Sequence, residues 1–381
     1  MRILLLGEYS NVHATLAEGL RALGHQVTVA SNGDFWKNYP RDIDLSRKEG
    51  KLGGLKLLTK VYAQLPRWRG YDVVQLINPM FLELKAERIL PIYKYLRKHN
   101  KMMVLCAMGM DWYWVHECTY NKPLRYSDFN IGEEARTIES AVREQRDWLG
   151  TAKERLNQYI AADCDQIITG LYEYQICYEP YFKEKTHFVP LPIKMPVNLS
   201  PLSPAAKLPN CSLLAIVSHP SPLRLFIGIS KGRSAYKGTD IMLKAAEDVL
   251  QAYPEKMELI KAEGVPFSEY QQLMDGSDAI LDQLYSYTPS MNPLMAMSKG
   301  IICIGGGEPE NYEIINEHEL RPIINVQPTY ESVREELEQL VLHPDRIPEL
   351  KRQSIEYVRK HHDYIKVAKE YEALYTRQKS R

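Results

Sequence analysis

The chain has 381 residues, enough for two domains of ordinary size, and its 45% hydrophobic and 25% charged content is typical of soluble globular proteins. Its formal net charge is 0, which argues against the overall positive field of a nucleic-acid-binding protein. No apolar run approaches the ~20 residues that a membrane span needs.

The cysteines are scattered, without a CxxC pair or a spacing typical of metal sites. This pattern predicts reduced thiols in a cytosolic protein, and no bound metal. The apolar N-terminus is short and runs directly into Gly7, so we interpret it as a buried strand and not as a signal peptide. The cysteines are Cys106, Cys118, Cys164, Cys177, Cys211 and Cys303.

The first elements follow a strand–loop–helix–strand order. We predict strands at 2–6 and 25–30 and a helix at 14–23 between them. The loop lacks GxGxxG, so a dinucleotide fingerprint is absent, but Gly7 lets the backbone approach a ligand closely. We expect its neighbours to line that spot, although a histidine at a helix start is more often a cap or a surface residue. The neighbours are Tyr9, Ser10, Asn11 and His13.

The segment 45–70 is basic and amphipathic. Its seven cations and one carboxylate, Glu49, give a local net charge of +6, and apolar residues recur at helical spacing before Trp68. Such a helix can lie on an anionic membrane surface, or it can be an ordinary surface helix packed on its domain. The cations are Arg47, Lys48, Lys51, Lys56, Lys60, Arg67 and Arg69, and the apolar positions are Leu52, Leu55, Leu58, Val61, Tyr62 and Leu65.

The rest of the first half continues the alternation of strands and helices. The strand at 102–107 leads into a loop with Gly109, Asp111 and three aromatic residues, which we expect at the ligand-facing end of the sheet. Asp111 either binds a substrate hydroxyl or caps a turn. Proline-rich stretches at 190–196 and 200–204 indicate an interdomain linker. The other predicted elements are strands at 71–77, 165–169 and 186–190, a helix at 83–99 and a long helical region at 132–162.

In the second half, a basic loop at 230–238 stands between a buried strand and a helix. Such a loop can hold a diphosphate, because backbone amides and the helix dipole bind the anion while Arg233 and Lys237 neutralise its charge. A basic turn can also be plain solvated surface. The elements predicted here are strands at 213–217, 225–229, 257–260, 279–284, 301–304 and 321–326, and helices at 239–251, 266–274, 294–299, 330–342 and 347–379.

Two polar loops, 285–293 and 305–312, follow neighbouring strands of this second half. Both are expected at the carboxyl end of a parallel sheet, where ligands bind. Pro293 suits the first turn of a helix, which would aim the amides around 290–292 at a ligand anion. The alternative is that the proline and glycine residues only form turns between secondary-structure elements.

Several of these motifs resemble retaining glycosyltransferases of family 4. The stretch 226–238 is similar to that family's donor-diphosphate loop, and LMAMSKG at 294–300 to its Glu-Ala-Met-Ala-x-Gly helix. The turn at 305–310 is similar to the glycine-rich turn after that helix, and the runs at 162–169 and 189–193 match its interdomain-facing strands. The resemblance implies an α/β, GT-B fold: two Rossmann-like domains with a central interdomain cleft.

The domains implied are an acceptor-binding domain at 1–200, a nucleotide-sugar-binding domain at 201–358, and a C-terminal helix at 359–381 that packs back on the first. The sequence departs from the family at one place. The family usually has a glutamate just before the 294–300 helix and another in its first turn, where this chain has Tyr287 and Met295. Glu308 or Glu310 would supply some of the missing acceptors, and Glu310 matches a glutamate that the family often keeps.

The function favoured is transfer of a sugar, with retention, from a donor such as a UDP- or GDP-sugar to a glycan or lipid-linked acceptor in cell-envelope polysaccharide synthesis. No metal or other cofactor and no nucleic acid is expected. The location would be the cytoplasm, or peripherally the inner face of the membrane through 45–70. The catalytic residues expected are Arg233, Lys237 and Asp111. The donor-binding residues expected are Gly228, Lys231, Gly232, Tyr287, Ser290, Met291, Asn292, Met295, Glu308 and Glu310. The acceptor-binding residues expected are Gly7, Tyr9, Ser10, Asn11, His13 and Gly109.

Two rival functions remain. Tyr287 and Met295 suggest a catalytically inactive relative that serves as a binding or scaffold protein. A sugar-nucleotide epimerase would also need a diphosphate site, and would add acid and base carboxylates. A glycosidase is less favoured, because no clear pair of catalytic carboxylates is visible.

Overall fold

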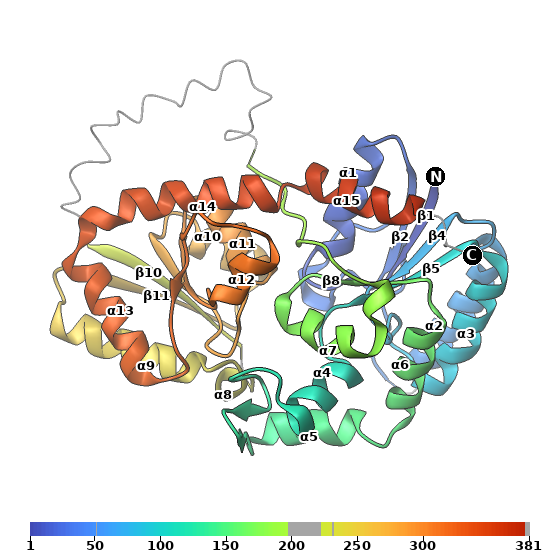
Figure 1. Ribbon diagram of the computed structural model, residues 1–381, viewed down its shortest axis with the longest axis horizontal. Coiled ribbons are helices and arrows are strands. Elements are labelled where there is room, and N and C mark those ends of the chain that lie inside the picture. Colours follow the sequence, from blue (N-terminus) through green and yellow to red (C-terminus); the bar gives the residue numbers. More distant parts are fainter. Residues whose placement is uncertain (51, 197–221, 231, 378–381) are drawn as a thin grey trace. The chain divides into compact units, whose positions relative to one another are not determined.

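The computed structural model describes residues 1–50, 52–196, 222–230 and 232–377. The chain divides into two compact units, each built on a parallel sheet (Figure 1). The first unit comprises Met1–Arg125, Phe129–Pro192 and Tyr364–Arg381, and the second comprises Tyr126–Asp128 and Ile193–Asp363. The chain therefore enters the second unit after Pro192 and returns to the first at Tyr364.

The first unit has a seven-stranded parallel sheet in the order β3-β2-β1-β4-β5-β8-β9. Its central strands are almost wholly buried, as is usual when helices cover both faces of a parallel sheet. The strands are β1 (Arg2–Leu6), β2 (Gln26–Ser31), β3 (Ile43–Asp44), β4 (Val73–Leu76), β5 (Met102–Ala107), β8 (Gln166–Thr169) and β9 (Thr186–Phe188). The α-helices are α1 (Val12–Ala22), α2 (Gly53–Gln64), α3 (Ala86–His99), α4 (Trp112–His116), α5 (Glu139–Trp148), α6 (Ala152–Asp163), α7 (Tyr172–Phe182) and α15 (Tyr364–Thr376).

The C-terminal helix α15 packs against α1 within the first unit, and the two lie side by side in Figure 1. Gly19 of α1 makes this approach possible, because a Cβ at this position would lie 2.5 Å from the carbonyl oxygen of Tyr364. At the far end of the pair, His25 Nε2 lies 2.9 Å from Glu372 Oε1. The last helix is thus an integral part of the first unit.

The second unit has a five-stranded parallel sheet in the order β11-β10-β12-β13-β14. Apolar side chains of α9, α13 and the start of α14 pack on one face, and those of α10 and α11 pack on the other. The strands are β10 (Leu223–Ile229), β11 (Met257–Glu263), β12 (Ala279–Leu281), β13 (Ile302–Gly305) and β14 (Ile324–Asn325). The helices are α8 (Ser234–Lys237), α9 (Thr239–Ala252), α10 (Phe267–Met274), α11 (Met291–Ser298), α12 (Pro309–Ile314), α13 (Tyr330–Leu342) and α14 (Ile347–His361).

Most predicted elements are confirmed, and the helix at 330–342 has the predicted bounds. The helical region predicted at 132–162 is confirmed from residue 139 onward as two helices, α5 and α6, which Gly150 separates in a left-handed conformation. Its predicted start is wrong, because an antiparallel pair, β6 (Asn130–Ile131) and β7 (Glu134–Ala135), lies there. The helical tail predicted at 347–379 is confirmed over its described residues as two helices, α14 and α15, which are interrupted at His362–Asp363. The strand predicted at 279–284 ends at Leu281, and the one at 213–217 lies outside the described residues.

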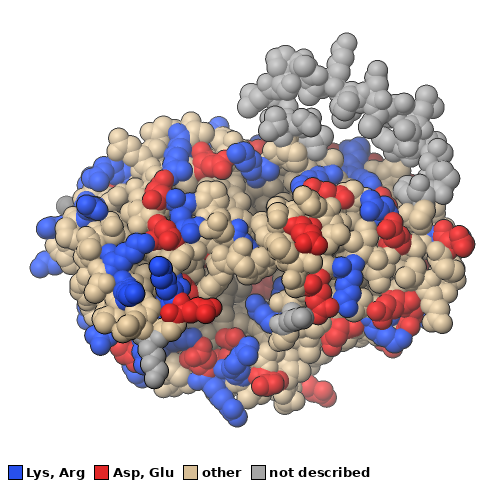
Figure 2. Space-filling model, turned by 180° about the vertical axis from the view of Figure 1, so that it is seen from behind, with Lys and Arg blue, Asp and Glu red and all other residues tan. Residues whose placement is uncertain are grey.

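The surface bears out the balanced composition. Figure 2 shows basic and acidic side chains interspersed over the face that it presents, without one dominant field of either sign. Five cysteines are described, and all are buried free thiols. Within the described residues, every helix is too short or too polar to cross a lipid bilayer.

Candidate functional site

The basic loop of the second unit is more ordered than the sequence predicts. It contains a single helical turn, α8, and Gly238 then starts α9 in a left-handed conformation with φ 74°. A Cβ on Gly238 would lie 2.5 Å from Leu284 Cβ, so only glycine fits without displacement. The amide of Leu284 donates to the carbonyl of Lys237 at 2.9 Å. The loops after β10 and β12 are therefore joined at the carboxyl edge of the sheet.

The two cations expected to bind the donor have different surroundings. Arg233 is exposed, and its guanidinium lies 5.2 Å from the centre of the Tyr236 ring. Lys237 is half-buried and faces Asp282, the residue directly after β12. Burial raises the pKa of Asp282, and the charge of Lys237 acts in the opposite direction. Gly232 is exposed with φ 73°, and Lys231 lies outside the described residues.

The side chain of Tyr270, in α10, packs against the end of β10. A Cβ on Gly228 would lie 2.7 Å from Tyr270 Cε2. The Tyr270 hydroxyl accepts a hydrogen bond of 3.0 Å from Asn292 Nδ2, in the first turn of α11. Asn292 also hydrogen-bonds to Asp282, which lowers the pKa that burial raises. Gly228 and Asn292 are thereby brought into one cluster with Asp282 and Tyr270, two residues that the sequence analysis missed.

The start of α11 holds the remaining predicted donor residues. Ser290 is the N-cap, but its side chain makes no capping hydrogen bond. Met291 is buried, and Met295 is half-buried, with its sulfur 3.7 Å from Gln271 Nε2. Pro293 lies in the first turn, as predicted. The Met295 thioether thus packs on α10, at the position where the resemblance would place a second glutamate.

Tyr287 and Glu308 belong to the packed interior of the second unit. The Tyr287 ring is 1% exposed and lies 4.7 Å, centre to centre, from the Tyr126 ring. Oε1 of Glu308 accepts hydrogen bonds from the Tyr126 hydroxyl at 2.6 Å, Asn325 Nδ2 at 3.1 Å and Gln327 Nε2 at 2.8 Å. Glu308 therefore already serves three protein donors. Glu310, in the first turn of α12, is half-buried.

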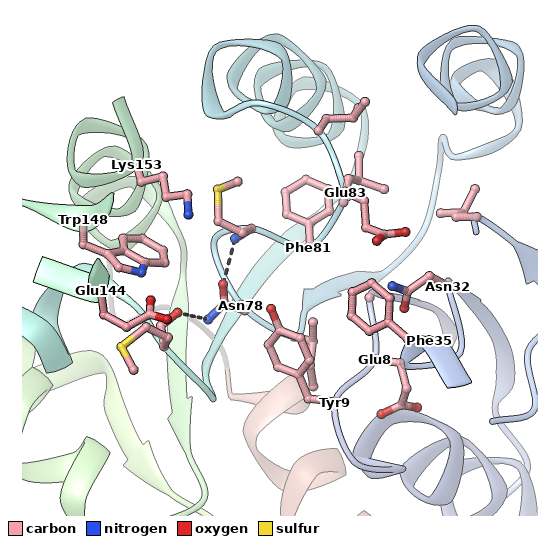
Figure 3. A pocket seen from close by; sticks show the side chains of 17 residues that line it. Glu8, Tyr9, Asn32, Phe35, Asn78, Phe81, Glu83, Glu144, Trp148 and Lys153 are labelled. Atoms are coloured by element: carbon pink, nitrogen blue, oxygen red, sulfur yellow. Dashed lines mark hydrogen bonds between the residues drawn. The ribbon is translucent and has the colours of Figure 1, made fainter. Parts of the chain in front are cut away.

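The first unit contains a pocket of about 290 Å³ at the carboxyl end of its central strands (Figure 3). Aromatic rings and polar groups alternate around it. Gly7 and Tyr9 line it as predicted, whereas Ser10, Asn11, His13, Gly109 and Asp111 do not. The other lining residues are Glu8, Asn32, Phe35, Leu45, Ile77, Asn78, Met80, Phe81, Leu82, Glu83, Leu84, Met110, Glu144, Trp148 and Lys153.

Glu8, which lines this pocket, hydrogen-bonds to the start of α1. Its two carboxyl oxygens accept hydrogen bonds from the amides of His13 at 3.2 Å and Ala14 at 2.8 Å. Burial raises the pKa of Glu8 to about 8, although the two amides act in the opposite direction. Glu8 is consequently a mostly protonated carboxyl at neutral pH.

The loop between β1 and α1 has an unusual backbone. Gly7, Ser10 and Asn11 have φ angles of 83°, 52° and 75°. A Cβ on Gly7 would lie 2.4 Å from Ile77 Cγ2, and the Ser10 amide donates to Asp34 Oδ2 at 2.8 Å. Such left-handed conformations are costly for residues other than glycine, so the surrounding contacts hold this loop in one shape.

His13 is neither a cap nor a surface residue, because its ring is fully buried. Nδ1 lies 2.8 Å from the Gly7 carbonyl oxygen, and Nε2 lies 3.1 Å from Gln75 Nε2. Burial lowers the pKa of His13 to about 4, so the ring is neutral at pH 7 and can donate through Nδ1 and accept at Nε2. Gln75 in turn accepts from the Tyr375 hydroxyl at 2.6 Å. A buried chain of hydrogen bonds thus links α15 to the Gly7 loop.

Asp111 caps a helix, which was one of its two predicted roles. Its Oδ1 accepts from the Trp114 amide at 2.9 Å, and its Oδ2 accepts from the Tyr178 hydroxyl at 2.6 Å. Burial raises the pKa of Asp111 to about 6. Gly109 has φ 76°, and a Cβ there would lie 3.1 Å from the Tyr9 ring. The structure therefore brings Gly109 and Tyr9 together and keeps Asp111 inside the unit.

The donor sets do not suggest a metal centre. Among the described residues, no three His, Cys, Asp or Glu side chains gather in a way that could hold an ion. The polar groups at both sheet edges hydrogen-bond to one another, as in the pairs Asn78–Met108 and Asn292–Tyr270.

Comparison with known proteins identifies the architecture. The sequence matches no protein-family profile and no curated protein sequence at a significant level. The fold matches that of HepE from Anabaena, solved in complex with UDP, with TM-score 0.55, 11% identity, and 98% of this chain and 99% of that chain covered. It matches sucrose-phosphate synthase from Thermosynechococcus elongatus with TM-score 0.60 and 13% identity, covering 98% of both chains.

A third similar structure is a putative UDP-N-acetylglucosamine 2-epimerase from Listeria monocytogenes, with TM-score 0.53, 10% identity, and 98% of this chain and 94% of that chain covered. All three matches extend over both units. The chain has a GT-B fold. At 10 to 13% identity these matches establish the GT-B architecture predicted from the sequence, and leave the reaction to be argued from the residues.

Proposed function

We propose that this GT-B protein is a glycosyltransferase that moves a sugar, with retention, from a nucleoside-diphosphate donor to a glycan or lipid-linked acceptor. The observation that carries the proposal is the basic loop after β10, whose Arg233 and Lys237 stand directly before the N-terminus of α9. A fourteen-residue helix presents unpaired amides and a positive dipole end, both of which favour an anion. The similar HepE structure contains UDP, which supports a nucleotide as the ligand.

The proposed mechanism relies on charge stabilisation. Negative charge develops on the diphosphate as the glycosidic bond breaks, and preorganised donors stabilise it more strongly than water does. Arg233 is exposed and free of a carboxylate partner among the described residues, so its guanidinium can reach a phosphate. Lys237 lies near Asp282, so it would act on the diphosphate at shorter range than Arg233. These two cations supply the positive charge, and the proposal requires no metal.

The acceptor is proposed to bind in the pocket of the first unit. Aromatic rings offer flat surfaces on which a sugar ring packs, and the neighbouring polar groups can hydrogen-bond to its hydroxyls. Tyr9, Phe81 and Trp148 provide the rings, and Asn32 and Glu83 provide polar groups (Figure 3). Cell-envelope polysaccharide synthesis on the inner side of the membrane is the setting that we propose for this reaction.

Binding of the donor is the first property to test. Melting temperatures of the full chain would be measured with UDP-, GDP- and ADP-sugars and with the free nucleoside diphosphates. We expect at least one base to raise the melting temperature at millimolar concentration, because a ligand that binds only the folded state stabilises it. No stabilisation by any of these compounds would overturn the proposal.

An epimerase is the second candidate, because one of the similar structures is a putative UDP-N-acetylglucosamine 2-epimerase. An epimerase converts its nucleotide sugar without an acceptor, whereas a transferase releases nucleoside diphosphate only when an acceptor is present or by slow hydrolysis. Analysis of a donor incubated alone by NMR separates the two. A binding protein without activity, which Tyr287 and Met295 would suit, would bind nucleotide and give no product in either case.

A further inference from the structure

Helix α2 has one apolar face packed into the first unit and a second apolar face in solvent. Leu57 and Val61 form the packed face and are buried. Leu52, Leu55 and Tyr62 form the outer face and are 65%, 58% and 48% exposed. Their spacing of three and seven residues places them on one side of the helix. The single stripe predicted from the sequence is therefore two stripes, and the outer one is unpartnered within the described residues.

The cations of this segment surround the outer face. Lys56 and Lys60 lie one turn apart along α2, beside the exposed leucines, and both are exposed. None of the segment's described cations forms an ion pair with another described residue. Glu49 is the one acidic residue between 45 and 70. The described cations are Arg47, Lys48, Lys56, Lys60, Arg67 and Arg69, all exposed.

This surface adjoins the pocket of the first unit. The amide of Arg47 donates to Oε2 of Glu83, a pocket residue, at 3.2 Å. The guanidinium of Arg47 lies 3.6 Å from the position of a Cβ on Gly54, in the first turn of α2. The hydroxyl of Ser46 donates to the carbonyl of Asn32, another pocket residue, at 3.3 Å. The start of α2 and the rim of the pocket are thus connected through one short segment.

Two further exposed aromatic side chains stand at the same rim. Phe35, which lines the pocket, is 61% exposed, and Trp36 is 60% exposed. The turn that carries them is fixed, because Asp34 Oδ2 accepts from the Ser10 amide at 2.8 Å and from Lys37 Nζ at 2.6 Å. Apolar groups held rigidly in solvent next to a binding pocket are typical of an interaction site.

We propose that the outer face of α2 docks on an anionic lipid bilayer. Exposed leucines and a tyrosine enter the headgroup region, while the flanking lysines and arginines bind anionic headgroups. A second copy of this chain is a poorer partner, because a symmetric contact would bring these cations together with almost no carboxylate to balance them. Docking places the pocket rim at the lipid surface. Resting on the proposed function, the acceptor class is then a membrane-embedded amphiphile.

Vesicle flotation tests the docking on the full chain. The vesicles are phosphatidylcholine alone, or phosphatidylcholine with phosphatidylglycerol at a ratio of about 7:3. We expect binding to the anionic vesicles, weakening with salt as surface charges are screened. Lys56→Gln/Lys60→Gln is expected to weaken binding about 30-fold, since each cation near the surface contributes about fivefold. Leu52→Ser/Leu55→Ser is expected to weaken it by about tenfold or more.

Matched variants control for unspecific effects. Lys94→Gln/Lys98→Gln removes two exposed lysines at the same spacing on α3, and Leu342→Ser removes an exposed leucine of the second unit. Both are expected to bind vesicles like the parent. Equal binding by the α2 variants and the controls would overturn the inference, as would absence of binding to anionic vesicles at low salt. A dimer that Leu52→Ser/Leu55→Ser converts to a monomer would assign the face to a second copy instead.

Calorimetry with UDP, GDP and ADP on the same preparations separates this inference from the proposed function. Nucleotide binding without vesicle binding removes the lipid surface and leaves the transferase proposal standing. Vesicle binding without any nucleotide binding retains the docking surface and removes the transferase.

Discussion

The hydroxyl of Tyr375 donates a hydrogen bond of 2.6 Å to Gln75 Oε1, although 300 residues separate the two. Both side chains are buried, and Gln75 lies on the central strand β4. Through Gln75 and the neutral ring of His13, the C-terminal helix reaches the Gly7 carbonyl at the floor of the pocket. The end of the chain therefore helps to hold the loop at its beginning.

Removing this hydroxyl is expected to destabilise the first unit. Tyr375→Phe leaves Gln75 Oε1 buried without its donor, which typically costs about 1–3 kcal/mol. The free energy of unfolding from urea denaturation measures the effect. Tyr120→Phe, at a tyrosine that is 62% exposed, is the control and is expected to change stability by less than about 0.5 kcal/mol. Equal stability of both variants would show that the Gln75 contact contributes nothing.

Glu8 is expected to make stability depend on pH. Its pKa is about 8 in the folded state against 4.5 ordinarily, so across this range the unfolded state binds fewer protons and stability falls as the pH rises. His13 has the opposite effect, because its pKa is about 4 against 6.5, but that effect ends near pH 6.5. Between about pH 6.5 and pH 8 His13 no longer opposes the slope of Glu8, which is worth about 2 kcal/mol over the window.

Glu8→Gln replaces the titrating carboxyl by a neutral amide of similar shape. Denaturation at a series of pH values should therefore show a decline for the parent protein above pH 6.5 and a smaller decline for this variant. Parallel curves for the two proteins would mean that Glu8 titrates normally, and that the buried environment does not control its charge.

The basic loop makes a quantitative prediction about the donor. Arg233→Ala and Lys237→Ala are each expected to weaken UDP binding about 10- to 100-fold, the usual loss for one charge-assisted hydrogen bond of about 1.5–3 kcal/mol. Titration calorimetry measures the dissociation constants. Lys244→Ala is the control, because Lys244 is an exposed lysine of α9 that pairs with Asp248 away from the loop. Unchanged affinity in both loop variants would remove the diphosphate site.

The close contact between Gly228 and Tyr270 can be tested by a double-mutant cycle. Gly228→Ala places a methyl group 2.7 Å from the Tyr270 ring, so the ring must move, at a cost of about 1–3 kcal/mol. In a Tyr270→Ala background the same glycine substitution is expected to cost much less, because the obstacle is gone. Additive effects of the two substitutions would contradict the contact.

The sequence predicts local elements of this chain well. Buried parallel strands such as β5 are continuous apolar runs, and α13 has clear apolar periodicity with Thr329 as its N-cap. Contacts between distant residues leave no such pattern. Nothing near Gln75 indicates a partner at Tyr375, and a histidine at a helix start gives no sign that its ring is buried.

Only part of the candidate site could be predicted from the sequence. Glycine and cation spacing located the loop at 230–238, and Gly7 and Tyr9 located the pocket. Asp282 was missed because the strand predicted at 279–284 included it, whereas the strand ends at Leu281 and leaves Asp282 in the loop. The two apolar faces of α2 could not be told apart either, because the sequence does not show which of its leucines are exposed and which are buried.

The last prediction concerns Tyr287, at the position where the resemblance to family 4 would place a glutamate. Tyr287 is 1% exposed, its ring lies 4.7 Å from the Tyr126 ring at a tilted angle of 38°, and its carbonyl accepts the Glu308 amide at 3.2 Å. Tyr287→Glu would bury a second carboxylate beside Glu308, and two like charges at short range repel each other. Burying a charge in this way typically costs several kcal/mol, so we expect a loss of more than about 3 kcal/mol and no gain in UDP affinity.

Tyr287→Phe keeps the contact with the Tyr126 ring and is expected to lose much less. The deficit of Tyr287→Glu should also shrink as the pH is lowered, because burial raises the pKa of the introduced carboxyl, which then becomes neutral at little cost. Urea denaturation at neutral and mildly acidic pH gives both comparisons. A stable Tyr287→Glu protein with tighter UDP binding would show that this position faces the donor and not the interior of the second unit.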